Sequence, residues 1–385
     1  MSHIEYSLKK LDQALQRKTH VTVLEIDLDA IAHNLKTYRQ ELKTDVLLLV
    51  MVKAQGYGTG ACELARFLEF SEVDYLGVAY TDEGVELRSH GIRLPTMVMN
   101  PERGSLEELI DASLEPVIYS FATLERFALA LKTKEIKEVY PIHLKVDTGM
   151  HRLGFQASEM ELLVKKLKEM PSVKVISVFT HLAATDEHEH DHFTIQQLEL
   201  FRKVSKQLKV DLGHDFICHA LNSVGISRFP EYQMDLVRLG IGVYGVSADP
   251  RLSLKHVATL KTIISQINDI QPGESVGYGR AYISTSARRI ATIPIGYADG
   301  LFRTFGNDKS SVQVAGKKAT IIGNICMDMC MIDVTGIDCA AGDEVIVFGK
   351  NPSVQELARI ADTIPYEILC AVDERVKRVY IKDEN

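Results

Sequence analysis

The chain has 385 residues, 46% of them hydrophobic, and a formal net charge of -8 at pH 7. Single hydrophobic cores stop growing at about 250 to 300 residues, so this length favours two domains. The acidic balance argues against non-specific nucleic-acid binding, which requires a basic face. No apolar run approaches the roughly 18 residues of a membrane span, and the first residues lack a signal-peptide pattern, so we expect a cytoplasmic protein. The six dispersed cysteines are expected to be reduced thiols.

The first part of the chain predicts an α/β domain. Residues 1–20 are polar, with leucines at helical spacing, and we expect a leader or linker there. A strand-like run at 21–26 follows, and we place the first domain at 21–250. Strand-like segments alternating with amphipathic helical segments are predicted at 46–52, 75–79, 96–99, 116–119, 140–146, 175–180, 216–219 and 236–244. Eight such strands over about 200 to 250 residues are typical of a TIM-like (β/α)8 barrel.

The pattern changes after residue 250, where alternating strand-like segments follow one another with tight turns between them. We expect them at 257–267, 287–295, 311–314, 320–325, 329–333 and 344–348. The sequence therefore predicts a second, mainly-β C-terminal domain at 251–385.

Lys53 ends the first predicted barrel strand, an aliphatic run without alternation that is typical of a strand buried on both faces. An ammonium at this position is partly desolvated, which makes the neutral amine available as a Schiff-base nucleophile or a base. A single strand-end lysine more often extends its ammonium into solvent. However, polar residues also follow the later strands, at 147–152, His181, Ser223 and Arg238. Because catalytic residues gather at the carboxyl ends of barrel strands, this placement favours a catalytic site.

Five motifs in fixed order resemble those of the alanine racemase family, and the resemblance covers nearly everything from residue 21 to the end. The motifs lie at 52–58, 145–154, 237–245, 295–300 and 325–328. In the first motif, the family usually has Asn, Ala and His where this chain has Gln55, Gly56 and Thr59. Lys53 and Tyr57 keep their places, so these departures bear on rate or stability rather than on the chemistry.

The resemblance implies a pyridoxal-phosphate enzyme that interconverts L-alanine and D-alanine and supplies D-alanine for peptidoglycan. The cofactor is the electron sink that makes the Cα proton removable. Lys53 would hold the cofactor and act as one base. Tyr278 would act from the opposite face, because a single group returns its proton mostly to the side it came from. A tyrosine is normally protonated at neutral pH, so cationic neighbours must stabilise its phenolate.

The same resemblance implies the binding roles. Arg238 would face the pyridine nitrogen and hydrogen-bond it without giving up its proton, which weakens the electron sink and disfavours transamination. His181 would support Arg238. Arg152 would pair with the substrate carboxylate and would be oriented by Lys145, which is carbamylated in many members. The remaining roles are phosphate binding by Tyr57, Ser223, Gly240, Ile241 and Tyr366, and the lining of a small substrate pocket by Met327 and Asp328.

A homodimer with shared active sites is expected. Lys53 and Tyr278 fall in different predicted domains, so some domain must reach over a barrel mouth. The resemblance implies that this is the partner's C-terminal domain, and a two-fold dimer would then have two equivalent sites.

Three other functions stay open at this point: a decarboxylase of the same fold, a broad-specificity racemase, and a non-catalytic cofactor-binding protein. The motifs around Tyr278 and Met327 oppose the decarboxylase, broad-specificity relatives tend to be exported, and retention of both bases argues against a non-catalytic protein.

Three histidines, His188, His190 and His192, suggest a metal site, but their spacing repeats no ligand pattern on one face. No metal is therefore expected.

Overall fold

The structure, a computed structural model, describes residues 21–71 and 73–382. The predicted leader or linker at 1–20 lies outside the described residues. The chain divides into two compact units. One comprises residues 32–56 and 60–254, and the other comprises 21–31, 57–59 and 255–382.

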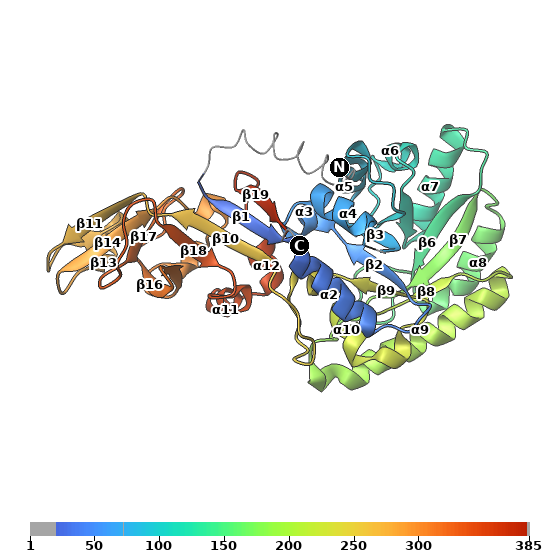
Figure 1. Cartoon of the computed structure of the whole chain (residues 1–385). Coiled ribbons are helices and arrows are strands. Elements are labelled where there is room, and N and C mark those ends of the chain that lie inside the picture. Colours follow the sequence, from blue (N-terminus) through green and yellow to red (C-terminus); the bar gives the residue numbers. More distant parts are fainter. Residues whose placement is uncertain (1–20, 72, 383–385) are drawn as a thin grey trace. The chain divides into compact units, whose positions relative to one another are not determined.

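The barrel unit contains a parallel sheet of eight strands among its described residues, in the order β8-β7-β6-β5-β4-β3-β2-β9 (Figure 1). All eight predicted barrel strands are confirmed, as β2 (Leu47–Met51), β3 (Tyr75–Val78), β4 (Thr96–Val98), β5 (Glu115–Ile118), β6 (Tyr140–Lys145), β7 (Val173–Phe179), β8 (Ile217–His219) and β9 (Leu236–Leu239). The last strand is shorter than predicted. Gly240 leaves the extended conformation, with φ -106° and ψ -114°, and the chain continues as a 3-10 turn, η4 (Ile241–Tyr244).

The barrel is nearly closed between β8 and β9. These two strands form no continuous ladder, but two backbone hydrogen bonds join their segments. The amide of Asp235 donates to the carbonyl of Cys218 at 3.1 Å, and the amide of Arg238 donates to the carbonyl of Leu221 at 3.0 Å. Closure brings the carboxyl ends of all these strands to one rim, which is where a barrel carries its site.

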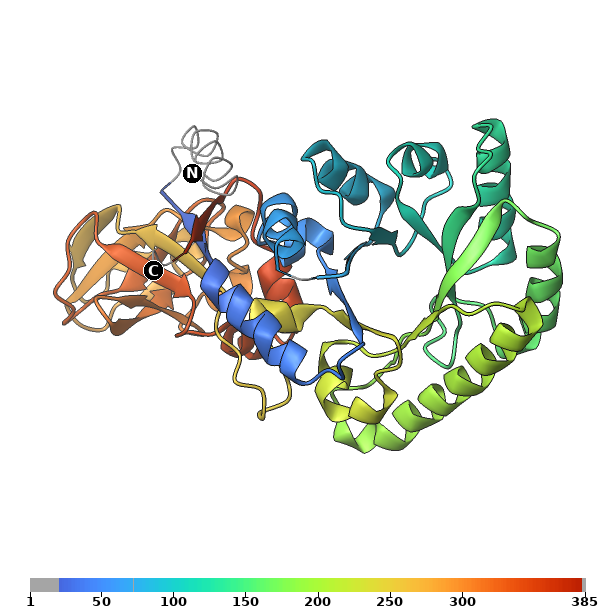
Figure 2. The same ribbon diagram turned by 45° about the vertical axis from the view of Figure 1, so that its right-hand side comes forward.

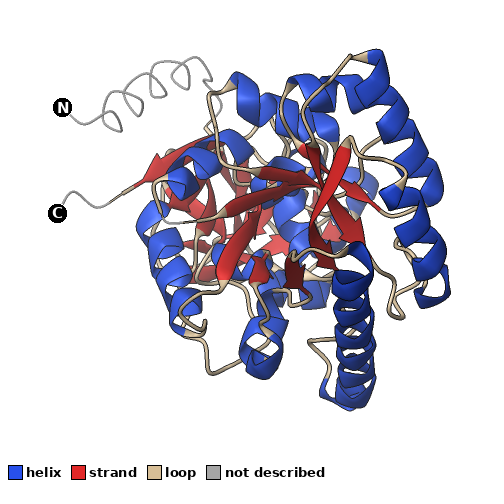
Figure 3. Ribbon diagram, turned by 90° about the vertical axis from the view of Figure 1, so that its right-hand side faces the viewer, coloured by secondary structure: helices blue, strands red, loops and turns tan. Residues whose placement is uncertain are grey.

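Helices cover the outside of the barrel strands, as Figure 3 shows with helices in blue and strands in red. Figure 2 shows the longest of them, α9, running along the outside of the barrel in yellow-green. Its inner face buries Leu198, Phe201 and Leu208, so apolar side chains cover the outer face of the strands beneath it. The helices of this layer are α4 (Ala61–Glu69), α5 (Thr81–Ser89), α6 (Leu106–Asp111), α7 (Phe121–Thr133), α8 (Met160–Lys168), α9 (Asp191–Leu212) and α10 (Ser223–Arg228).

The second unit is built on a sheet that has nine strands among the described residues, in the order β11-β14-β17-β16-β15-β18-β10-β1-β19. The strands are β1 (Val23–Asp27), β10 (Ala258–Ile263), β11 (Gln266–Ile270), β14 (Arg288–Ile293), β15 (Ser311–Val314), β16 (Lys317–Ile322), β17 (Cys330–Asp333), β18 (Glu344–Phe348) and β19 (Lys377–Ile381). A two-stranded hairpin of β12 (Ser275–Val276) and β13 (Tyr282–Ile283), and the helices α11 (Val354–Ile360) and α12 (Pro365–Cys370), complete it. The mainly-β prediction for this region is confirmed.

Strand β1 corrects the predicted start of the barrel domain at residue 21. It pairs antiparallel with β10 and parallel with β19, so it belongs to the nine-stranded sheet. The burial pattern of β1 explains its place in this sheet. Leu24 and Ile26 are buried while Val23 and Glu25 are half-buried, an alternation typical of a strand with one face in a core. Helix α2 (Leu28–Gln40) follows directly. None of the described helices has the length and apolarity needed to span a membrane.

Candidate active site

Lys53 lies at the carboxyl end of β2, where the backbone turns into an unusual conformation. The next three residues, Ala54, Gln55 and Gly56, have φ of 52°, 53° and 60°, which is the left-handed region. The segment α3 (Lys53–Tyr57) is thus a left-handed turn. It is held at its start by Glu83, whose carboxylate accepts the Ala54 amide at 2.6 Å. For residues with a Cβ this conformation costs about 1 to 2 kcal/mol each, so the turn stores strain next to the predicted catalytic lysine.

Arg238, on β9, is buried and forms hydrogen bonds at both terminal nitrogens. Its Nη1 donates to His219 Nδ1 at 2.7 Å, and its Nη2 donates to the carbonyls of Thr180 and Ala220 at 2.8 and 2.9 Å. His181 Nδ1, predicted to support Arg238, lies 3.3 Å from Nη2. The described contacts engage Nη1 and Nη2, which leaves Nε–H for a ligand. Burial lowers the pKa of Arg238 to about 9, so the guanidinium still carries its charge at neutral pH.

His219 is a site residue that sequence reasoning missed. Its ring stacks on Phe179, with centroids 4.8 Å apart and an interplanar angle of 13°. Burial, followed by the charge of Arg238, lowers the pKa of His219 well below its usual value. The same two causes lower the pKa of His181. Arg238 is therefore held by two neutral imidazoles, which accept its hydrogen bonds without neutralising its charge.

Four cationic side chains gather at the barrel mouth. Burial lowers the pKa of Lys145 to about 8, and the charges of Arg152, Arg238 and Lys53 act in the same direction. Arg238 and Lys145 also share the ring of Phe179, at 5.1 and 5.9 Å from its centroid. A concentration of positive charge at the ends of the strands is suited to an anionic ligand.

Arg152 is carried by a loop that Asp147 organises. One oxygen of this buried carboxylate accepts the amides of Gly149, Met150 and His151 at 3.0 to 3.1 Å. Its other oxygen accepts Gln156 Nε2 at 3.0 Å. Burial alone would raise the pKa of Asp147, but these hydrogen bonds outweigh it and lower that pKa. The loop is thus a built structure with Arg152 exposed on it.

Ser223 joins two of the predicted phosphate-binding segments. Its Oγ accepts the backbone amides of Gly240 at 2.8 Å and Gly242 at 3.3 Å, which leaves the hydroxyl hydrogen for a ligand. The amide predicted to bind phosphate at Gly240 is thus engaged by Ser223. Ile241 follows it in the η4 turn and is buried.

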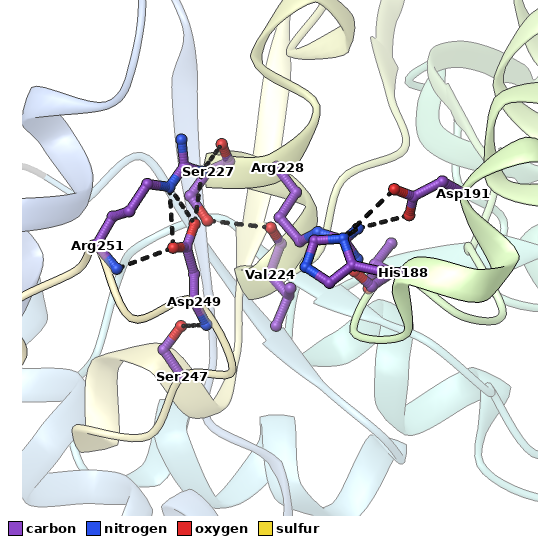
Figure 4. Close-up of polar contacts among 9 residues, drawn as sticks. His188, Asp191, Val224, Ser227, Arg228, Ser247, Asp249 and Arg251 are labelled. Carbon is purple, nitrogen blue, oxygen red and sulfur yellow. Dashed lines mark hydrogen bonds and ion pairs between the residues drawn. The ribbon is translucent and has the colours of Figure 1, made fainter.

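Polar contacts of arginine side chains hold helix α10, which begins at Ser223, on two sides (Figure 4). Arg228, at its end, contacts Asp191 and His188, each at 2.5 Å. Arg251 donates to the Ser227 carbonyl at 2.8 Å and pairs with Asp249 at 2.6 Å. These contacts fix the short helix and therefore the position of Ser223.

Tyr57 and Tyr366 lie together in the second unit, with ring centroids 5.8 Å apart. Tyr57 is buried, and burial raises its pKa, with Tyr366 and Cys370 adding to the effect. The Tyr57 phenol therefore stays protonated at neutral pH and can donate a hydrogen bond. Gly58, next to Tyr57, touches backbone: a Cβ there would lie 2.2 Å from the Leu369 carbonyl oxygen. This contact explains the glycine in the first motif.

The other predicted residues of the second unit line an open hollow of about 800 Å³. Tyr278 is 74% exposed and Met327 is 54% exposed. The hollow is lined further by Tyr297, Arg303 and Met329, among others. Asp328 also lines it, but its carboxylate is held by Arg375, at 2.8 Å, which in turn bonds the buried Asp299 at 2.7 Å. The structure therefore brings the predicted residues together in groups, some in each unit.

Two groups of potential metal ligands occur among the described residues. Cys62, Glu86 and His90 place ligand atoms within 4.8 Å of one another, as do the exposed Glu187, Glu189 and His190. Exposed acidic groups of this kind are common without a metal. The expectation of no metal stays a prediction.

A (β/α)8 barrel with two lysines, two arginines and a strained turn at the carboxyl ends of its strands is suited to catalysis on a small anionic substrate. Comparison with known proteins identifies the family. The family described as the alanine racemase N-terminal domain matches residues 26–248, and the alanine racemase C-terminal domain matches residues 257–380. The chain belongs to the alanine racemase family.

Relatives support this assignment over nearly the whole length. The chain is 37% identical to the alanine racemase of Halothermothrix orenii over 379 residues, which cover 95% of this chain and 98% of that protein. The alanine racemase structure from Clostridium difficile 630 has a TM-score of 0.89 and 35% identity, covering 94% of this chain and 96% of that chain. The Bartonella henselae alanine racemase structure, with covalently bound pyridoxal phosphate, has a TM-score of 0.85 at 29% identity, covering 94% and 99%.

Proposed function

We propose that the protein interconverts L-alanine and D-alanine with pyridoxal phosphate as its cofactor. The observation that carries the proposal is the cluster of Lys53, Lys145, Arg152 and Arg238 at the barrel mouth. A phosphate and a carboxylate are both anionic, so cofactor and amino acid match this charge. The D-alanine formed would supply peptidoglycan, and we expect the reaction to take place in the cytoplasm.

The residues of the barrel fit pyridoxal phosphate. Ser223 keeps its hydroxyl hydrogen, and Arg238 keeps Nε–H, beside a lysine at the end of β2. When bound, the cofactor draws electrons from Cα and makes its proton removable. Arg238 would hydrogen-bond the pyridine nitrogen and retain its own proton, because guanidinium stays charged at neutral pH.

Lys53 and Tyr278 would exchange the Cα proton from opposite faces. Each would accept the proton in one direction of the reaction and donate it in the other, which inverts the centre. Arg152 would hold the carboxylate, and Asp147 would fix the loop that carries Arg152. Met327 would restrict the space available to the substrate side chain.

We propose that Lys145 is carbamylated. Carbon dioxide reacts with a neutral amine, and a pKa of about 8 makes the neutral form far more abundant than in an ordinary lysine. The resulting negative charge would lie beside Arg152 and would orient it. It would also relieve the repulsion among the clustered cations.

We propose a homodimer in which Tyr278 acts at the partner's barrel. Contiguous exposed apolar surface marks protein interfaces, and Tyr278, Met327, Met329 and Tyr297 are all exposed around the same hollow. The partner's barrel mouth is the surface that this hollow would meet.

Turnover of single amino acids tests the function. L-alanine and D-alanine should be interconverted in preference to lysine and arginine, because in the proposed site Met327 and Tyr278 would crowd the space around the substrate side chain, where a methyl group would fit most easily. Optical rotation or a coupled D-amino-acid assay would measure it. Comparable turnover of lysine would instead indicate a broad-specificity racemase, and release of carbon dioxide would indicate a decarboxylase.

A further inference from the structure

A chain of buried polar side chains runs through the barrel interior from Arg238 to Glu115. The distances are 2.7 Å from Arg238 Nη1 to His219 Nδ1, and 3.2 Å from His219 Nε2 to Ser177 Oγ. They are 2.6 Å from Ser177 Oγ to His143 Nδ1, and 2.8 Å from His143 Nε2 to Glu115 Oε2. Four strands, β9, β8, β7 and β6, contribute one side chain each, and β5 contributes Glu115.

The strand register places these side chains on one face of the sheet. His143 lies directly opposite Ser177, and Phe179, two residues further, lies opposite His219. Cys218, which precedes His219 on β8, faces outward, where Ser205 of helix α9 hydrogen-bonds its thiol. Because successive side chains alternate, His219 points inward. His143 and His219 are almost completely buried, so their ring nitrogens depend on neighbouring side chains for hydrogen bonds.

Arg238 and Glu115, at the two ends of this hydrogen-bonded series, fix the direction of its outer hydrogen bonds, and the single hydroxyl hydrogen of Ser177 fixes the inner ones when both imidazoles are neutral. Arg238 can only donate, so His219 Nδ1 must accept and its Nε2 carries the hydrogen. His219 then donates to Ser177, whose single hydroxyl hydrogen is free to donate to His143 Nδ1. At the far end, an ionised Glu115 can only accept, so His143 also carries its hydrogen on Nε2. The constraints from Arg238 and from Glu115 therefore give the same tautomer for both histidines, with hydrogen on Nε2 and a lone pair on Nδ1.

Glu115 is well placed as the fixed end of this chain. It begins β5, at the amino-terminal end of the barrel, and its side chain is 16% exposed. Tyr75, which begins β3, donates a further hydrogen bond to the same carboxylate. The carboxylate of Glu115 is thus separated from Arg238 by the side chains of His143, Ser177 and His219.

We infer that Glu115, His143 and Ser177 are positioning residues for Arg238, which they orient through His219. The chain holds His219 with its lone pair toward Arg238 and keeps a carboxylate away from the guanidinium. The charge of Arg238 stays available to the ligand. The effect on the reaction rests on the proposed function, in which Arg238 faces the pyridine nitrogen, whereas the hydrogen positions do not.

Hydrogen positions in the wild-type holoenzyme test the inference directly. Nitrogen-15 resonances of histidine-labelled protein, assigned by replacing each histidine in turn, distinguish a protonated from an unprotonated ring nitrogen. We expect His143 and His219 both to carry hydrogen on Nε2 and a lone pair on Nδ1. A hydrogen on Nδ1 of either residue would overturn the inference.

Ser177→Ala tests the effect on the reaction, with Cys218→Ala as the matched control on the neighbouring strand. Both remove one buried heavy atom, but only the first interrupts the chain. We expect Ser177→Ala to raise pyruvate formed per alanine turnover by about ten-fold, because Arg238 would lose its fixed orientation. Misplacement of a positioned group by about 1 Å can lower a reaction rate by up to about 100-fold. Cys218→Ala should leave the ratio unchanged.

Two further variants separate the possible failures. Glu115→Gln keeps an acceptor for His143 and should change the ratio less than Glu115→Leu, which removes it. If Ser177→Ala folds and the ratio is unchanged, the positioning role is wrong. Arg238→Glu, which offers the pyridine nitrogen a carboxylic proton, should also raise the ratio. An unchanged ratio in Arg238→Glu would refute the proposed role of Arg238 and leave the wild-type hydrogen positions as a separate result.

Discussion

At the scale of single residues, the left-handed turn after Lys53 accounts for one departure from the family motif. Gly56 has φ 60° and ψ 46°, a conformation in which an alanine Cβ crowds the following carbonyl. Glycine adopts it without that penalty. Gln55 lacks the short side chain with which asparagine tolerates the same region, so it adds strain where Gly56 removes it. The two substitutions therefore act in opposite directions on the stability of the turn.

Gly56→Ala is expected to lower the free energy of unfolding by about 1 kcal/mol, because alanine pays the left-handed penalty. The midpoint of urea denaturation measures the change. Gly104→Ala is the control, since Gly104 does not have a positive φ and a Cβ there would meet nothing within 4 Å. Equal midpoints for Gly56→Ala and the wild type would contradict the strain argument.

Lys145 gives a second prediction, on its proposed carbamylation. In protein supplied with carbon-13 bicarbonate above pH 8, a carbamate resonance should appear and should be absent from Lys145→Ala. Lys36→Ala, which changes an exposed lysine, should retain it. The folded pKa of Lys145, about 8, is below its ordinary value of 10.5, so protonation below pH 8 should weaken the signal. A resonance that persists in Lys145→Ala would assign the carbamate elsewhere.

At the scale of elements, the loop from Asp147 to Gly154 shows how a polar motif is built around one carboxylate. The amide of Phe155 donates to the Lys145 carbonyl, and the amide of Asp147 donates to the Phe155 carbonyl, each at 2.9 Å. These bonds close the loop at its base while the Asp147 carboxylate holds its inside. Arg152 owes its position to this framework.

Asp147→Asn should cost about 1.5 to 3 kcal/mol at pH 7, the range for hydrogen bonds to a charged group. The pKa of Asp147 is lowered in the folded protein. Its stabilisation is therefore present above the unfolded value of about 4 and is lost as pH falls through the folded pKa. The stability difference between wild type and Asp147→Asn should shrink below pH 4, as thermal unfolding across pH would show. Asp186→Asn, at an exposed position, should show no such trend; a difference independent of pH would exclude the charge of Asp147 as its cause.

Periodicity predicted the barrel strands because their aliphatic runs are continuous, but it could not assign every strand to a sheet. The run at 21–26 looked like a strand and gave no sign of its partners, which lie more than 200 residues away. The internal polar chain was missed for a related reason. His143 and Lys145 alternate with apolar residues on β6, a signal that was available. The link of His143 to Ser177 and His219 depends on register, which single segments do not reveal.

At the scale of the whole molecule, the proposed dimer follows from the separation of the two candidate bases. Lys53 belongs to the barrel unit and Tyr278 to the second unit, where it is exposed beside a hollow. An isologous dimer would use the same pair of surfaces twice and give two equivalent sites. The monomer is then expected to be inactive.

Mixing Lys53→Ala with Tyr278→Phe after reversible dissociation tests this arrangement. Each mixed dimer would contain one site with both defects and one with neither. Random exchange makes half the dimers mixed, so about a quarter of wild-type sites should return. Activity measured before and after exchange gives the result, and self-exchange of each variant is the control. Activity that stays at the level of the separate variants after complete exchange would refute shared sites.

The placement of β1 in the nine-stranded sheet has a consequence for vectorial synthesis on the ribosome. Residues 23–27 leave the exit tunnel before the other described strands, yet their neighbour β10 begins at Ala258 and their other neighbour β19 begins at Lys377. The barrel residues lie in sequence between β1 and β10, and the barrel strands can pair with one another as they emerge. Strand β1 therefore cannot pair with β19 until synthesis is nearly complete. A nascent chain stalled before residue 377 exposes an unpaired edge of β1 that chaperones would have to cover.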